Sequence, residues 1–231
     1  MSILITGASG RLGSELTKHI SGFTPSRREM DITDEASVAR YASGKPIDLI
    51  VHCAGYTNVT GAEKERELCY TTNVIGTLCI AKLRLPTIHI STDGVFSGEE
   101  GNYSEEHHLD PCNFYNFTKC MAEMPIRMLP RYVILRFSFR MRPFQYEKAW
   151  TDKFSSADYV DVLGKHVGSV ASNFSNYPNG AYHLGRDRQS IFELARETRD
   201  VEPMSFKEIQ GVRLQKDSSL NLSKWRKLCN Q

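Results

Sequence analysis

A tyrosine and a lysine, Tyr115 and Lys119, stand four residues apart in a segment that we expect to be helical, so both side chains lie on one face of that helix. A phenol has an ordinary pKa of about 10, and a neighbouring ammonium group favours its ionised form. The pair therefore predicts an acid or base that operates nearer neutral pH. Thr92, just past an expected strand, adds a neutral hydroxyl that can bind a carbonyl oxygen. Together these residues are typical of ketone reduction by hydride from a nicotinamide cofactor.

A repeated glycine near the chain start provides a place for such a cofactor. Gly7, Gly10 and Gly13 stand at three-residue intervals between an apolar run at residues 3–5 and an amphipathic segment. The first glycine allows a tight strand-to-helix turn, the second lets the backbone approach a pyrophosphate, and the third allows close helix packing. The helix N-terminus then faces the negative charge. The alternative is a glycine-rich turn that binds nothing.

Alternating strands and helices must position these residues. Short apolar runs predict buried strands, and the longer stretches between them predict helices. The expected strands are residues 3–6, 48–53, 87–91 and 132–137, and the expected helices are residues 10–20, 34–42, 61–82 and 111–128. This order predicts an α/β fold with a doubly wound, Rossmann-like parallel sheet covered on both faces. Since ligands bind beyond the carboxyl ends of such strands, residues 53–55 and 91–93 should meet the glycine turn at one crevice.

The chain divides at about residue 142 in this interpretation. Residues 1–142 form a Rossmann-like NAD(P)-binding domain. Residues 143–231 form a reduced substrate lobe and a terminal helix, packed on the same core. In this second part we expect helices at 150–168, 190–198 and 221–229 and a short strand at 180–184.

Composition limits the partners and the compartment. A net charge of +2 on 231 residues gives no surface suited to a polyanion, so we expect no nucleic acid partner. The six cysteines form no C-x-x-C pair and predict reduced thiols. Met1 leads directly into the first strand and no apolar run reaches membrane-spanning length, so we expect a cytoplasmic protein without a membrane partner. The histidines lack the spacing of metal ligands, and we expect no metal.

With these motifs in place, the chain resembles an extended short-chain dehydrogenase/reductase, and in particular the dTDP-4-dehydrorhamnose reductase family. The matching stretches are residues 3–13 (ILITGASGRLG), 30–34 (MDITD), 52–59 (HCAGYTNV), 91–96 (STDGVF) and 115–119 (YNFTK). Weaker similarity follows at residues 135–138, 181–184, 190–195 and 218–221. The resemblance is strong as far as about Arg136 and weakens along the small lobe.

The resemblance implies NADPH-dependent reduction of the 4-keto group of a 4-keto-6-deoxy nucleotide sugar. Thr92 and Tyr115 would bind the keto oxygen, Tyr115 would donate the proton, and Lys119 would hold the nicotinamide ribose and lower the tyrosine pKa. The implied cofactor-binding residues are Gly7, Ser9, Gly10, Arg11, Leu12, Gly13, Arg27, Arg28, Asp31, Ile32, Cys53, Ala54, Gly55, Asn73 and Lys119. The implied substrate-binding residues are Thr57, Asn58, Asp93, Arg136 and Phe139.

Residues 24–28 (TPSRR) favour NADPH as the cofactor. An NAD site usually has an acidic residue at the end of the second strand, where it binds the ribose 2′-hydroxyl. Here the region carries Arg27 and Arg28, either of which suits a 2′-phosphate. The alternative is a solvent-facing basic pair, with NADH still accepted.

Two departures from the family pattern affect the substrate side. Gly94 stands where related dehydratases carry a glutamate and related epimerase-reductases a cysteine, so simple reduction is favoured over the alternative of an epimerase or dehydratase. The reductases usually have a tyrosine there, so the glycine either leaves room in the pocket or weakens substrate binding.

The segment after Arg136 is compressed, and Arg136, Arg140 and Arg142 either grip a diphosphate or form a solvated cluster. Phe139 either stacks on a sugar or fills the core.

Other classes of function stay open at this point. One branch of the family resembles the regulatory partner of methionine adenosyltransferase, and a shortened lobe suits a non-catalytic, NADP-binding regulatory subunit. Reduction of a smaller carbonyl compound is a third alternative. A homodimer is an open possibility for the assembly.

Overall fold

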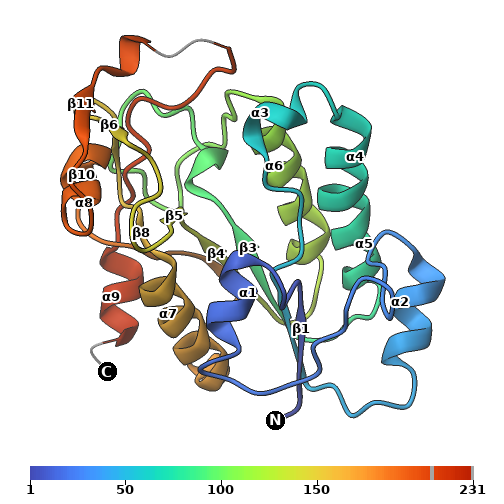
Figure 1. The fold of residues 1–231 in the computed structure, drawn as a ribbon. Helices are drawn as coiled ribbons and strands as arrows, with labels where there is room; N and C mark the ends of the chain where they lie inside the picture. The colour runs from blue at the N-terminus through green and yellow to red at the C-terminus, as the bar shows by residue number, and fades with distance from the viewer. Residues whose placement is uncertain (209–210, 230–231) are drawn as a thin grey trace.

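Five parallel strands form the central sheet of the computed structural model, which describes residues 1–208 and 211–229, with the backbone alone at Glu208 (Figure 1). The strands, in spatial order, are β1 (Ile3–Thr6), β2 (Leu49–His52), β3 (Thr87–Ser91), β4 (Tyr132–Arg136) and β9 (Gly180–His183). Every neighbouring pair is parallel. The predicted α/β fold with a parallel sheet is therefore confirmed.

The chain changes direction beside β1. Phe23 extends the sheet on the side of β1 away from β2, because its amide donates to the Ile3 carbonyl at 2.8 Å and its carbonyl accepts from the Ile5 amide at 2.8 Å. The next strand along the chain, β2, lies on the opposite side of β1. Such a switch leaves a crevice at the carboxyl ends of the strands. The glycine turn begins at this crevice.

Helices of very different lengths connect the strands. They are α1 (Arg11–Leu16), α2 (Glu35–Ala42), α3 (Val59–Ala62), α4 (Arg66–Tyr70), α5 (Gly76–Ala81), α6 (Phe114–Arg127), α7 (Val160–Ser172), α8 (Ile191–Arg196) and α9 (Ser223–Cys229). None of the helices in the described part of the chain is long and apolar enough to cross a membrane.

Side-chain caps fix where two of these helices begin. The Asp34 carboxylate accepts the Ala36 amide at 2.9 Å before α2, and the Asn113 side chain accepts the Asn116 amide at 2.9 Å before α6. Such caps satisfy amides of the first turn that have no partner within the helix. The cap at Asn113 therefore sets the start of the helix that carries Tyr115.

Alternating side chains allow helices to cover both faces of the sheet. Ile3 and Ile5 share one core cluster with Leu16 of α1 and Leu163 of α7. Leu4, between them in β1, points to the other face and packs in a cluster with residues of α2 and α5. Figure 1 shows α1 and α7 on one side of the sheet and α2, α5 and α6 on the other.

The segment 61–82, expected as one helix, contains a break and a π-helical turn. Helix α3 ends at Ala62, and α4 continues through a π-helical turn (Thr71–Ile75) into α5. Within that turn Asn73 is buried, and its side chain bonds to the backbone of Tyr56. A π-helical turn inserts one residue into a helix and often occurs at functional sites. The apolar periodicity of the sequence does not indicate this insertion.

Residues 150–168, expected to be helical, begin as short strands. They include β7 (Phe154–Ser155) and β8 (Asp158–Tyr159), preceded by β6 (Lys148–Trp150), before α7 begins. Strand β7 pairs with β10 (Gln189–Ser190), β8 with β5 (Phe139–Arg140), and β6 with β11 (Glu202–Met204). Most of these partners lie far along the chain, so a local pattern could not indicate the pairing. The labels β6, β10, β11 and α8 gather in a small lobe at the upper left of Figure 1.

The last part of the chain returns to the central sheet. Strand β9 lies beside β4, α7 packs against α1, and Trp225 of α9 is buried in the same core cluster as Ile3. The division of the chain at residue 142 stays a prediction.

Candidate active site

The glycine turn between β1 and α1 is tight at two of its three glycines. Gly7 has a φ of +67°, and a Cβ there would come within 2.7 Å of the Ala54 backbone. A Cβ at Gly13 would lie 2.1 Å from the Gly7 carbonyl oxygen. A Cβ at Gly10 would meet that oxygen alone, at 3.1 Å. The outer side of Gly10 is therefore open, and its backbone is accessible to a ligand.

The first turn of α1 suits an anion. Its N-cap is Gly10, which makes no side-chain cap, and the turn contains no acidic residue. The amides of this turn can therefore donate to a negatively charged group. Ser9 and Arg11 are exposed beside it, whereas the Leu12 side chain is buried and leaves only its backbone available. These residues fit the pyrophosphate of a dinucleotide.

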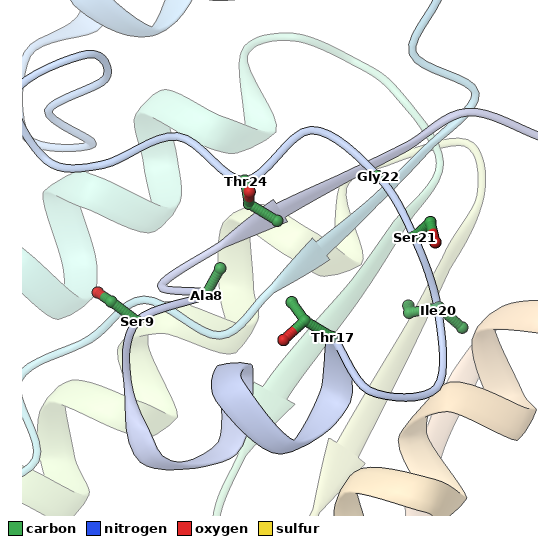
Figure 2. Close-up of a pocket in the computed structure, with 7 residues that line it drawn as sticks. All are labelled: Ala8, Ser9, Thr17, Ile20, Ser21, Gly22 and Thr24. Atoms are coloured by element: carbon green, nitrogen blue, oxygen red, sulfur yellow. The ribbon is translucent and has the colours of Figure 1, made fainter.

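A groove of about 480 Å³ continues from this turn along α1 (Figure 2). It is lined by Ala8, Ser9, Thr17, Ile20, Ser21, Gly22 and Thr24. Figure 2 shows it between α1 and the chain segment at Gly22 that leads past the sheet edge. Ala8 and Ser9 join the groove to the glycine turn, and Thr24 leads along the chain toward Arg27.

Arg27 and Arg28 are both exposed at the end of this segment. The Nε of Arg27 lies 3.3 Å from Asp31 Oδ2, so Asp31 partly neutralises its charge. Asp31 also accepts the amide and the hydroxyl of Thr33 at 2.9 and 2.7 Å, and these hydrogen bonds lower its pKa. Arg28 has no ion pair within the described residues, which makes it the better candidate for a 2′-phosphate. Ile32, by contrast, is almost fully buried in the core.

The loop after β2 packs against the glycine turn. Cys53, Ala54 and Gly55 follow β2, and the Ala54 amide donates to the Thr6 hydroxyl at 3.2 Å. Burial raises the pKa of the Cys53 thiol to about 12, so this group stays protonated. Gly55 is exposed. The structure therefore brings this loop and the turn together, as the sequence predicts.

Asn73 holds the same loop against α6. Its Oδ1 accepts the Tyr56 amide at 2.8 Å, and its Nδ2 donates to the Tyr56 carbonyl at 3.2 Å and to the Thr118 hydroxyl at 2.9 Å. The Thr118 hydroxyl in turn donates to the Tyr115 carbonyl at 2.7 Å. Asn73 is only 2% exposed, and its side chain positions the loop; its contact with the cofactor stays a prediction.

Thr92, Tyr115 and Lys119 gather at the carboxyl end of β3. Helix α6 packs against β3, and Lys119 Nζ donates to the Ile90 carbonyl at 2.6 Å. The Thr92 hydroxyl accepts the Gly94 amide at 3.1 Å, just beyond the strand. A hydroxyl, a phenol and an ammonium group therefore stand at one edge of the sheet.

Burial dominates the pKa values of this group. It raises the pKa of Tyr115, and the negative charge of Asp93 acts in the same direction. Burial also lowers the pKa of Lys119 to about 8, although Glu123 opposes this change. The expected lowering of the tyrosine pKa by Lys119 therefore does not hold for the protein alone. Tyr115 is a neutral phenol near neutral pH, which is the form that donates a proton.

Asp93 is buried beneath Thr92 and bonded to three hydroxyl groups. Its Oδ2 accepts from Ser138 at 2.8 Å and from Ser218 at 2.7 Å, and its Oδ1 accepts from Thr92 at 3.1 Å. With 6% exposure, the carboxylate joins three segments of the chain rather than facing outwards. The sequence analysis did not assign the two serines, although both lie in the weaker family-like stretches that could have indicated them.

Gly94 leaves no extra room in the pocket. A Cβ there would lie 2.1 Å from Asn116 Oδ1, because the buried Asn116 side chain fills that space. The Gly94 carbonyl also accepts the Gln215 side-chain amide at 2.8 Å. Of the two expectations for this glycine, an enlarged pocket is therefore wrong.

Arg136 does not face the crevice, so its expected contact with substrate is wrong. It is 1% exposed, and its Nε and Nη2 donate to the two carboxylate oxygens of Glu123 at 2.9 and 2.7 Å. The Ser91 hydroxyl donates to the same carboxylate at 2.7 Å. Arg142 is also paired, with Asp161 at 3.0 Å. These two arginines therefore have their charges matched by protein carboxylates.

The remaining candidates for substrate binding are Thr57, Asn58 and Phe139. Thr57 and Asn58 are exposed, and Asn58 caps α3 by accepting the Gly61 amide at 2.9 Å. Phe139 packs against the main core cluster, with its ring centroid 6.5 Å from that of Phe137. Of the two roles considered for Phe139, core packing is the one that the contacts support.

A parallel sheet with a switch at β1, a glycine turn and a Thr-Tyr-Lys group at the strand ends define a Rossmann-like protein of the short-chain dehydrogenase/reductase class. A family model, the RmlD substrate binding domain, matches residues 1–142. The chain belongs to this family, and the resemblance to dTDP-4-dehydrorhamnose reductases seen in the sequence is confirmed.

Individual relatives agree with this placement. The chain is 34% identical to the spore coat polysaccharide biosynthesis protein SpsK of Bacillus subtilis, over 79% of this chain and 72% of that protein. It is 28% identical to a dTDP-4-dehydrorhamnose reductase of Aggregatibacter actinomycetemcomitans, over 72% of this chain and 61% of the relative's length. The crystal structure of dTDP-4-dehydrorhamnose reductase from Bacillus anthracis in complex with NADP superposes with a TM-score of 0.86 at 27% identity, covering 98% of this chain and 92% of the other.

Proposed function

We propose that this chain is an NADPH-dependent reductase of the 4-keto group of a 4-keto-6-deoxy nucleotide sugar. The observation that carries the proposal is the gathering of Thr92, Tyr115 and Lys119 at the sheet edge to which the glycine turn also opens. The relatives named dTDP-4-dehydrorhamnose reductase support the substrate class, and the NADP complex of the Bacillus anthracis protein supports the cofactor.

In this proposal two side chains bind the ketone and a third holds the cofactor. The nicotinamide, when bound, supplies the hydride. The Thr92 hydroxyl and the Tyr115 phenol bind the keto oxygen, and Tyr115 donates its proton to that oxygen. The raised pKa of Tyr115 keeps this proton in place at neutral pH until the oxygen becomes basic. Lys119 uses its ammonium group to hold the nicotinamide ribose.

The cofactor is held mainly by backbone. Amides around Gly10 at the start of α1 bind the pyrophosphate, with Ser9 and Arg11 beside it. Arg28 binds the 2′-phosphate that distinguishes NADPH from NADH, because its guanidinium is exposed and not shared with a carboxylate. Asp31 and the loop at Ala54 flank the remainder of the cofactor.

The experiment is a turnover assay with a panel of 4-keto-6-deoxy sugars linked to dTDP, UDP or GDP. The loss of NADPH absorbance is followed, and the product is checked for deuterium at C4 when deuterated NADPH is used. Deuterium at C4 supports the proposal. Tight NADPH binding without turnover across the whole panel contradicts it and favours the regulatory subunit.

A second copy of the chain is the proposed partner. Phe117, Met121, Met124 and Met128 lie on one face of α6 and are 42%, 37%, 57% and 84% exposed. Such an apolar stripe on a helix is suited to packing against the same helix of another copy around a two-fold axis. Met124→Glu should then convert a dimer to a monomer in sedimentation velocity, and a wild-type chain that is monomeric throughout the micromolar range contradicts the proposal.

We place the reaction in the cytoplasm. All six cysteines are free, and burial raises the pKa of Cys53, Cys69, Cys79, Cys112 and Cys120. Unreactive thiols of this kind are typical of a reducing compartment.

A further inference from the structure

Arg140 lies next to the turn that carries Thr92, without a carboxylate partner. It belongs to β5, two residues after Ser138, whose hydroxyl donates to Asp93 at 2.8 Å. Residues two apart in an extended chain point to the same side, so Arg140 faces the Asp93 turn. Within the described part of the chain, its one hydrogen bond runs from Nη1 to the neighbouring Phe139 carbonyl, at 3.0 Å. Most of the guanidinium donors therefore remain available.

Lys153 is tied to the same turn through Gln215. It is 7% exposed, and its Nζ donates to the Gln215 backbone carbonyl. The Gln215 side chain donates to the carbonyls of Gly94 at 2.8 Å and of Phe96 at 3.1 Å, which fixes this segment against the Asp93 turn. Burial lowers the pKa of Lys153 to about 8, Asp93 opposes that change, and the charge of Arg140 adds to it. The hydrogen bonds of Ser138 and Gln215 therefore place both cations beside the Asp93 turn.

The carboxylates nearby are already engaged. Asp93 accepts from three hydroxyls and makes no ion pair with any residue that the structure describes. Asp217 is paired with Arg188 at 2.7 Å. Among the side chains that the structure describes, neither Arg140 nor Lys153 has a carboxylate within ion-pair distance. A half-buried arginine and a buried lysine beside the single carboxylate of Asp93 leave an excess of positive charge at this point.

Such an excess of positive charge destabilises the folded chain unless an anion binds beside it. A buried charge without a partner destabilises the folded chain, whereas a bound phosphate gives both cations charge-assisted hydrogen bonds. These two cations lie beside the turn that directly follows Thr92, and Thr92 binds the keto oxygen in the proposed function. In a nucleotide sugar, the diphosphate is the anionic group joined to the reacting sugar.

We propose that Arg140 and Lys153 form the binding site for the diphosphate of the nucleotide-sugar substrate. This inference rests on the proposed function for the identity of the ligand. Of the three arginines that the sequence suggested for a diphosphate, Arg136 is neutralised by Glu123 and Arg142 is paired with Asp161, which leaves Arg140. The guanidinium supplies two parallel donors and the ammonium group a single charge, a combination that suits a diphosphate.

The test measures binding separately from turnover. The full chain, saturated with NADPH so that the glycine turn is filled, is titrated by calorimetry with dTDP, UDP, inorganic pyrophosphate and uncharged thymidine. Three variants are compared with the wild type: Arg140→Gln, Lys153→Met and the control Arg142→Gln, whose arginine is already paired with Asp161. Far-ultraviolet circular dichroism and the Kd for NADPH report whether each variant is folded.

We expect nucleoside diphosphates and pyrophosphate to bind to the wild type, and thymidine to bind much more weakly. Arg140→Gln and Lys153→Met should each weaken diphosphate binding by ~10- to 100-fold with the Kd for NADPH unchanged, and Arg142→Gln should have less than about a two-fold effect. Unchanged diphosphate affinity in both variants, or equal binding of thymidine and dTDP, overturns the site. If one of the two variants does not fold, the diphosphate affinity of the other variant decides in the same way.

The two proposals can fail separately. Diphosphate binding that depends on both cations, in a chain that reduces no keto sugar, supports this site and contradicts the reductase. Turnover of a nucleotide sugar that survives both substitutions with an unchanged KM supports the reductase and overturns the site.

Discussion

Arg136 and Glu123 form a two-point ion pair that is closed to solvent beneath the strand end carrying Thr92, with 1% and 0% of their side chains exposed. The Ser91 hydroxyl joins the same carboxylate, so one buried group ties together β3, β4 and α6. Burial alone would raise the pKa of Glu123, but the hydrogen bonds and charge of Arg136 hold it below its ordinary value. The pair thereby fixes the strand and the helix that carry the proposed catalytic residues.

Removing one member of this pair should destabilise the fold. Glu123→Ala leaves a buried guanidinium without a partner and is expected to lower the free energy of unfolding by about 3–5 kcal/mol in urea denaturation. The double variant Glu123→Leu with Arg136→Met removes both charges and should lose much less. A single variant within about 1 kcal/mol of the wild type would contradict this account of the pair.

Gly94 and Asn116 should behave as a coupled pair. In Gly94→Ala the new methyl group would meet the Asn116 side chain at 2.1 Å, which we expect to cost about 1–3 kcal/mol of stability and to displace the Thr92 turn. Adding Asn116→Ala removes the contacted atoms and should recover most of the loss. A double-mutant cycle on thermal unfolding measures the coupling, and simple additivity of the two changes would refute it.

Much of this arrangement could be predicted from sequence, for identifiable reasons. The strands at 3–6 and 87–91 are short, apolar and bounded by turn residues, and they appear with the predicted ends. The turn at Gly7 was predictable because its requirements are local: a positive φ and a close approach that only glycine permits.

The parts that sequence did not indicate depend on distant contacts. Arg136 is buried because it forms an ion pair with Glu123, which lies on another element and is marked by no sequence motif. The role of Lys153 depends on Gln215, 62 residues along the chain, which returns to contact Gly94. Pairings of this kind arise only when the small lobe folds back on the strand ends.

Cofactor preference should depend on Arg28. Arg28→Ala is expected to weaken NADPH binding by ~10-fold or more and to leave NADH binding nearly unchanged, since only NADPH carries the 2′-phosphate. Fluorescence titration with both cofactors measures the two Kd values. Arg27→Ala is the matched control and should have a smaller effect, because Asp31 already shares that charge. Equal weakening for both cofactors in Arg28→Ala would remove Arg28 from the 2′-phosphate site.

NADPH binding should weaken as the pH rises through about 8. Burial lowers the pKa of Lys119 to about 8 from its ordinary value near 10.5, so its ammonium group is present below that pH and is lost above it. The contact with the nicotinamide ribose is lost with the charge. The Kd for NADPH, measured from pH 6 to about 9.5, should rise in the wild type and stay high and flat in Lys119→Met. A flat wild-type profile would contradict the assignment of Lys119.

The central claim is that Tyr115 donates the proton in a ketone reduction. The most direct measurement compares single-turnover reduction of a 4-keto-6-deoxy nucleotide sugar by the wild type and by Tyr115→Phe, with NADPH bound to both. The account predicts an unchanged Kd for NADPH and a loss of about 10²- to 10⁴-fold in the rate of the chemical step. A Tyr115→Phe variant that reduces the sugar at the wild-type rate would contradict it.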